Sequence, residues 1–196
     1  MADPTGLPRA LDASADPPLR ALPPGAGELL RELAAPPRLV AHLRLVHDVA
    51  GQLADRLGAY CPGLPFARDA VLFGAATHDV GKAVHTAELS GPGSAHEEGG
   101  RELLLAHGFT EEQARFAATR ADWAEPGVSV EELLVSTADK VWKGKRVPGL
   151  EDLPVARIAE AAGTEPWAVL LDLDELLGTI AEGAERRLAF QGRFPV

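Results

Sequence analysis

A long helical repeat of apolar residues between positions 39 and 57 is the feature that most constrains the fold of this 196-residue chain. Apolar residues recur at spacings of three and four, which places them along one face of a helix. The repeat consists of Leu39, Leu43, Val46, Ala50, Leu53, Ala54 and Leu57. Pro37 precedes it, at or near the N1 position that proline favours. Other helical stretches follow without strand-like alternation, so the sequence predicts an all-α protein, a compact helical bundle.

The chain is expected to form one helical domain behind a proline-rich N-terminal arm. Residues 1–25 contain six prolines, and we expect this arm to be extended or poorly ordered, with at most a short turn near residues 7–11. The alternative is that part of it packs back on the domain. Residues 26–196 are long enough for a single hydrophobic core. The C-terminal helices are expected within residues 154–190, at about 155–162 and 166–189.

Three short polar patterns predict helix starts. Ser94 with Glu97, Thr110 with Gln113, and Ser129 with Glu132 have the spacing of a capping box. In this arrangement the side chains at the N-cap and N3 positions each accept a hydrogen bond from the other residue's backbone N–H. The segment between Lys82 and Gly93 is expected to be a loop.

The composition excludes several classes of protein. The formal net charge of −10 argues against stable binding to nucleic acid or to an anionic membrane. The one cysteine, Cys61, excludes an intrachain disulfide framework and is typical of a reducing compartment. No secretory signal and no apolar run of membrane-spanning length is visible. We therefore expect a cytoplasmic protein.

Two His-Asp pairs stand on or beside predicted helices. His78 and Asp79 come at the end of a helix that is expected from about residue 66 to 77 and to terminate near Gly81, where glycine permits a left-handed exit. The other pair is His47 and Asp48. His47 falls within the apolar face of the 39–57 repeat, whereas Asp48 is rotated away from it. His47 is therefore predicted to point inward.

A further carboxylate, Asp139, lies beside the apolar face of the helix that begins near Ser129. An ion pair with Lys143, four residues on, would suit a surface position. The flanking Ala138 and Trp142 favour a buried metal ligand instead, because an unpaired buried carboxylate is costly.

Three helices would then contribute His47, His78, Asp79 and Asp139 to one site. Mixed nitrogen and oxygen donors suit one six-coordinate divalent ion such as Mn, Fe, Co, Ni or Mg better than a structural zinc.

The order of these residues, H…HD…D, resembles that of the HD-domain superfamily of metal-dependent phosphohydrolases. The resemblance spans about residues 42–146, within a motif core of about 38–146. It implies that His47, His78, Asp79 and Asp139 hold the metal. It also implies hydrolysis of a phosphomonoester or phosphoanhydride of a small metabolite, such as a nucleotide, by metal-bound hydroxide.

The same resemblance suggests further roles around the His-Asp pair. Lys82 completes the order His-Asp-x-Gly-Lys and is predicted to bind a substrate phosphate and assist catalysis, the alternative being a surface lysine at a helix end. Two-metal members of the superfamily add two more histidines. His96 resembles the first, but Arg120 or Asp122 stands at the expected place of the second. This departure favours one metal, with His96 as a catalytic acid. His85 remains a candidate for supporting the site or binding a second metal, or is a solvated loop residue.

Basic residues after Asp139 offer phosphate-binding groups. Lys140, Lys143, Lys145 and Arg146 form a local cluster in an otherwise acidic chain. We predict Lys143, Arg146 and Arg120 as phosphate ligands, the alternative being an ordinary solvated face.

Two other functions remain possible at this stage. Some HD-fold proteins are di-iron oxygenases, which need two metals. The HD fold can also serve as a non-catalytic module that binds a ligand or partner.

Overall fold

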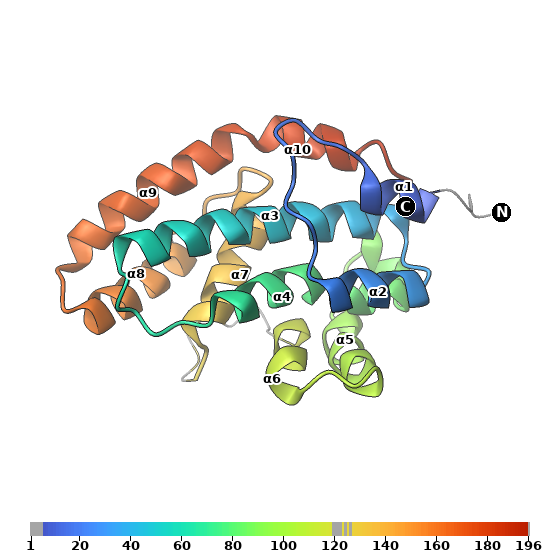
Figure 1. Ribbon diagram of the computed structural model, residues 1–196, viewed down its shortest axis with the longest axis horizontal. Helices are drawn as coiled ribbons and strands as arrows, with labels where there is room; N and C mark the ends of the chain where they lie inside the picture. The colour runs from blue at the N-terminus through green and yellow to red at the C-terminus, as the bar shows by residue number, and fades with distance from the viewer. Residues whose placement is uncertain (1–5, 119–122, 124, 126, 196) are drawn as a thin grey trace.

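The structure is a computed structural model that describes residues 6–118, 123, 125 and 127–195, and these residues form helices and no strand (Figure 1). The predicted all-α fold is confirmed. The α-helices are α1 (Gly6–Asp12), α2 (Pro24–Glu32), α3 (Pro37–Tyr60), α4 (Arg68–Thr77), α5 (Ala95–Ala106), α6 (Glu111–Ala114), α7 (Val130–Val141), α8 (Pro148–Ala162), α9 (Pro166–Glu182) and α10 (Ala184–Gln191). Three 3₁₀ helices join them: η1 (Val80–Ala83), η2 (Thr86–Leu89) and η3 (Arg115–Ala117). Within the described part of the chain, no helix is both long and apolar enough to cross a membrane.

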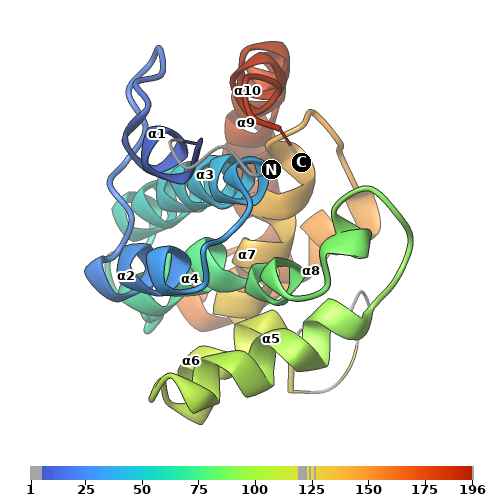
Figure 2. The ribbon, with the colours of Figure 1, turned by 90° about the vertical axis from the view of Figure 1, so that its right-hand side faces the viewer.

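Helix α3 runs through the middle of the bundle. It begins at Pro37 as predicted, and α1, α4, α7 and α10 pack around it (Figures 1 and 2). The apolar repeat from Leu39 to Leu57 is buried, but so are residues on its other faces, among them His42, Arg44 and Leu45. Because neighbours cover α3 on several sides, one apolar stripe does not identify the only inward-facing side chains.

The N-terminal segment packs on α3 instead of forming only an extended arm. Helix α1 replaces the short turn expected there. The buried guanidinium of Arg44 donates hydrogen bonds to the carbonyl oxygens of Ala10 and Ala13, at 2.8 and 2.9 Å. Farther along, Arg20 pairs with Asp55 at 2.6 Å. These contacts attach the proline-rich segment to the central helix.

Gly81 is needed for close packing, which differs from its predicted role. It is not among the described glycines with positive φ, so a left-handed helix exit does not explain it. A Cβ atom on Gly81 would overlap the His96 carbonyl oxygen and lie 2.6 Å from the Gly100 nitrogen. The backbone of η1 therefore rests directly on α5, and this contact brings the segment after Asp79 against His96.

Replacing Gly81 by alanine is expected to lower the free energy of unfolding by about 1–3 kcal/mol, because two backbones must move apart. Gly58→Ala is the matched control, since nothing lies within 4 Å of the added Cβ and alanine favours the helical conformation. Urea unfolding of both variants measures the difference. Equal stability of the two variants would contradict the close-packing explanation.

Two of the three predicted capping boxes are confirmed. Thr110 with Gln113 and Ser129 with Glu132 form both reciprocal hydrogen bonds at the starts of α6 and α7. Ser94 makes no capping bond with its side chain, so that prediction is wrong. Part of the expected loop 82–93 is instead helical, as η1 and η2.

The C-terminal helices form one side of the bundle. Helix α8 begins at Pro148, earlier than predicted, and α9 and α10 replace a single long helix (Figure 1). Arg56 of α3 binds Asp172 of α9 at 2.6 Å, which ties this side of the molecule to the central helix.

Candidate metal centre

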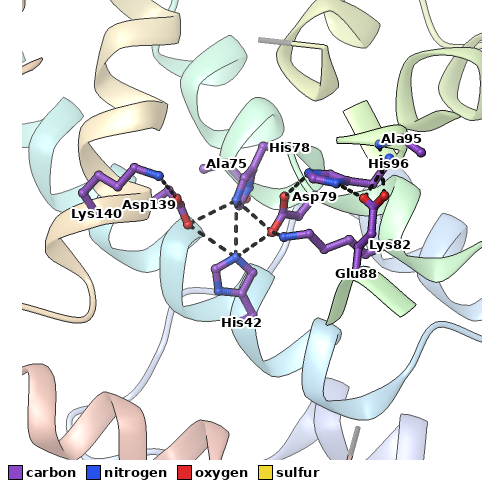
Figure 3. Close-up of polar contacts among 10 residues, drawn as sticks. All are labelled: His42, Ala75, His78, Asp79, Lys82, Glu88, Ala95, His96, Asp139 and Lys140. Carbon is purple, nitrogen blue, oxygen red and sulfur yellow. Dashed lines mark hydrogen bonds and ion pairs between the residues drawn. The ribbon is translucent and has the colours of Figure 1, made fainter. Parts of the chain in front are cut away.

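Three helices bring two imidazoles and two carboxylates together. His42 lies on α3, Asp139 lies on α7, and His78 and Asp79 follow the last residue of α4 (Figure 3). Helix α4 packs against both α3 and α7, so its C-terminal end projects His78 and Asp79 into the space between them. The side chains of all four residues are at most 18% exposed.

The donor atoms of His42, His78 and Asp139 are close enough to share one ion, and Asp79 lies beside the two imidazoles. His42 Nε2 lies 3.3 Å from His78 Nε2, 3.2 Å from Asp79 Oδ2 and 3.5 Å from Asp139 Oδ1. His78 Nε2 lies 3.8 Å from Asp79 Oδ2 and 3.6 Å from Asp139 Oδ1. Ligands bound about 2.0–2.2 Å from one ion stand at similar separations from each other. One donor atom from each of His42, His78 and Asp139 lies within 4.8 Å of the other two.

Neighbouring groups orient the two imidazoles. His78 Nδ1 lies 3.0 Å from the Ala75 carbonyl oxygen, and donation to that oxygen leaves the Nε2 lone pair facing the cluster. The ring of His42 packs edge-on against Trp142, with centroids 5.1 Å apart. Both Nε2 atoms therefore converge on the same point, where two imidazole lone pairs repel each other unless a proton or cation lies between them.

The charges in the cluster favour ionised carboxylates. Burial opposes ionisation, but the imidazoles of His78 and His42 hold the pKa of Asp79 well below its usual value. The pKa of Asp139 is also lowered, against the effect of burial, by His78 and His42. In turn, the two carboxylates raise the pKa of His78 although its burial acts in the other direction. Two ionised carboxylates beside two imidazoles fit a divalent cation, the kind of ion predicted from the sequence.

His47 is not part of this cluster, so its prediction as the α3 ligand is corrected to His42. The two residues are five positions apart, which rotates their side chains by about 140° around the helix. His47 is 2% exposed, and its Nδ1 has no hydrogen-bond partner in the described structure. It lies near Asp48, Arg20 and Arg44, away from the cleft.

Two lysines lie beside the carboxylates of the cluster. Lys82 Nζ is 2.6 Å from Asp79 Oδ2, and Lys140 Nζ is 2.8 Å from Asp139 Oδ2. Asp139 therefore pairs with the adjacent Lys140, and the sequence alternative of an Asp139–Lys143 pair is not formed. The position of Lys82 next to the cluster is compatible with its predicted contact to a substrate phosphate.

His96 faces the cluster from the far side of Asp79. Its Nε2 lies 3.3 Å from Asp79 Oδ1, and its Nδ1 lies 2.5 Å from Glu88 Oε2 (Figure 3). Hydrogen bonding to Asp79 and Glu88 raises the pKa of His96. The Glu88 carboxylate also accepts hydrogen bonds from the backbone N–H groups of Ala95 and His96, at 3.1 Å each. Glu88 therefore performs the capping role that the sequence assigned to Ser94, and it holds His96 in place.

The other predicted site residues have different positions. Arg146 binds Glu151 and Asp174 at 2.8 and 2.6 Å and does not line the cleft, so its phosphate-binding prediction is wrong. His85 packs over Gly99, where a Cβ would lie 2.5 Å from its Nε2, and does not join the described metal-binding group. Lys143 lines the cleft. Arg120 lies outside the described residues.

The cluster opens into a cleft of about 440 Å³. Metal-binding candidates, lysines and apolar groups share its walls, which is typical of a site for a small polar molecule. Apolar lining comes from Leu39, Leu89, Phe116, Val135 and Trp142. Such a cleft can place a ligand oxygen beside the four donor residues while the remainder of the ligand contacts the walls.

Comparison with known proteins gives one result. The sequence model of the HD domain family matches residues 39–142, which is more than half of the chain and includes His42, His78, Asp79 and Asp139. Searches of curated proteins and of solved structures gave no match. Metal-dependent hydrolase chemistry is typical of HD domains, and the histidine and aspartate cluster agrees with it. On the extent of this match and on its all-α fold, the chain belongs to the HD domain family.

Proposed function

We propose that the protein is a metal-dependent phosphohydrolase that acts on a phosphoester or phosphoanhydride of a small metabolite, nucleotides included. The observation that supports this most directly is the group of His42, His78 and Asp139, with Asp79 beside the imidazoles, in the wall of a cleft. In this proposal these residues hold one divalent ion. When bound, such an ion supplies a water of lowered pKa and polarises a phosphoryl oxygen.

Lys82 is the group proposed to bind the phosphate undergoing hydrolysis. Its ammonium lies next to Asp79 and lines the cleft, so a phosphoryl oxygen at the cluster comes within its reach. A charge-assisted hydrogen bond from Lys82 would orient the phosphate and balance the charge that develops on its oxygens.

His96 is proposed to give a proton to the leaving oxygen. Glu88 holds Nδ1, so Nε2 is the nitrogen that faces Asp79 and the cleft. As the bond from phosphorus to the ester oxygen breaks, transfer of the Nε2 proton to that oxygen releases a neutral alcohol. Water supplies the new oxygen on phosphorus, and the products are the alcohol and inorganic phosphate.

The experiment is phosphate release from a panel of phosphomonoesters and nucleotides with Mn, Co, Ni, Fe or Mg. We expect turnover with at least one metal and its loss in the presence of a chelator. Lys82→Met should lower kcat/KM by roughly 10- to 100-fold, the effect of removing a charge-assisted hydrogen bond. Lys145→Met, outside the cleft, is the matched control.

Absence of turnover with every metal and substrate would contradict the proposal. Two irons per chain together with dioxygen consumption would favour the oxygenase alternative. Tight binding of a phosphorylated ligand without turnover would favour a non-catalytic module.

A further inference from the structure

Two cations that line the cleft, Arg38 and Lys143, do not pair with the carboxylates of the metal-binding cluster. Lys82 pairs with Asp79, and Lys140 pairs with Asp139. In contrast, neither Arg38 nor Lys143 forms an ion pair with any residue that the structure describes. Within the described part of the chain, the one electrostatic contact of Lys143 is a cation–π contact with Trp142, in which Nζ lies 5.9 Å from the ring centroid.

Each of these two cations lies four residues in the sequence from a residue of the metal-binding cluster. Arg38 precedes His42 by four residues on α3, and Lys143 follows Asp139 by four residues, two positions beyond the last residue of α7. Residues four apart on a helix lie on one face, separated by about one turn, or roughly 5.4 Å. The ring of His42 packs against Trp142, the residue that precedes Lys143. Arg38 therefore lies about one turn from His42 on α3, Lys143 lies just beyond the end of α7, and both line the same cleft.

Arg38 gains no stabilising electrostatic interaction from the described residues at its position in the helix. It lies in the first turn of α3, where the helix dipole disfavours a positive charge, and no described carboxylate compensates it. An anion in the cleft would compensate both Arg38 and Lys143. Among the described lining residues, four cations face four carboxylates, so a divalent ion makes the lining positive overall.

We propose that Arg38 and Lys143 form a second anion site, and that the substrate has two anionic groups. One group is the phosphate at the metal cluster, and the other is a phosphate or carboxylate about one helical turn farther along the cleft. This inference rests on the proposed phosphohydrolase function and narrows its substrate class. A phosphomonoester whose remainder is uncharged would use only one of the two sites.

Calorimetry on the Mn-loaded protein tests this without turnover. The probes are alkane bisphosphonates with two to four methylenes, alkylphosphonates of equal length, and the matching phosphonocarboxylates. We expect at least one bisphosphonate or phosphonocarboxylate to bind wild-type protein roughly 10- to 100-fold more tightly than its alkylphosphonate, as charge-assisted hydrogen bonds allow. The relative affinities of bisphosphonate and phosphonocarboxylate identify the second group as phosphate or carboxylate.

In the double variant Arg38→Gln and Lys143→Gln, this preference should fall to less than about threefold, a change that calorimetry resolves. The control is Arg31→Gln with Lys145→Gln, which removes the same charges from exposed positions outside the cleft. Wild-type protein that binds mono- and dianionic probes equally, or binds neither, would overturn the inference. Persistence of the preference in the double variant would also overturn it. A preference that is lost as expected, in a protein that hydrolyses no phosphoester, would support the second anion site and count against the phosphohydrolase.

Discussion

Replacing His42 by alanine is expected to remove the bound metal and to lower phosphate release by more than about 100-fold. Loss of a residue that only hydrogen-bonds to a metal ligand already lowers metal affinity or activity by roughly 10- to 100-fold. His42 would itself be a ligand, so a larger effect is expected. Its Nε2 lies within 3.5 Å of donor atoms from His78, Asp79 and Asp139, so its removal opens one side of the site. Elemental analysis of protein purified without added metal gives the metal content per chain.

His47→Leu is the control for this experiment, because His47 lies on the same helix but outside the cluster. Leucine is similar in size, and it removes a buried ring nitrogen that has no described partner. We expect His47→Leu to retain the wild-type metal content. Loss of metal from His47→Leu and retention by His42→Ala would reverse our assignment and restore the ligand set first predicted from the sequence.

The sequence located the candidate metal-binding residues near the ends of α4 and α7 better than the candidate on the long helix α3. His78 and Asp79 directly follow the apolar α4, and Asp139 stands near the buried Ala138 and Trp142, so the local sequence marks all three. On α3, the periodic pattern indicates one buried face, yet His42 and His47 are both buried, at 8 and 2% exposure. Only the packing of α4 and α7 shows which of these faces meets the other ligands. In the sequence, the position of His42 three residues after the apolar Leu39 was the pattern that could have indicated that His42 is also buried.

Contacts between distant segments account for the other differences. The reciprocal capping boxes of α6 and α7 depend on residues three apart and were predictable. Glu88 instead caps α5 from a separate 3₁₀ helix, so the local pattern at Ser94 was misleading. Arg146 follows the same rule. Arg146 lies in a basic cluster in the sequence, but in the structure it forms an ion pair with Asp174, 28 residues away.

The protein is expected to lose about 3 kcal/mol of stability through His47 as the pH falls from about 6.5 to about 4. Burial is the main cause that lowers the pKa of His47 from 6.5 to about 4 in the folded protein. Between these values the unfolded chain binds the proton more readily than the folded chain, so the free energy of unfolding decreases as the pH decreases. The magnitude follows from about 1.4 kcal/mol per pKa unit. The full contribution is present above about pH 6.5, and the loss levels off below about pH 4.

Comparison of wild type with His47→Leu isolates this effect. Urea unfolding in the presence of a chelator, at intervals from pH 7.5 to pH 4, gives both stability curves without a contribution from metal binding. The imidazoles with raised pKa, His78 and His96, act in the opposite direction, since they stabilise the folded state at low pH and lose that contribution as the pH rises. Their effects are common to both proteins and cancel in the difference. We expect that difference to change by about 1.4 kcal/mol per pH unit near pH 5 in favour of His47→Leu. Parallel curves would show that His47 is protonated as easily in the folded protein as in the unfolded chain, which is incompatible with a neutral, buried imidazole on α3.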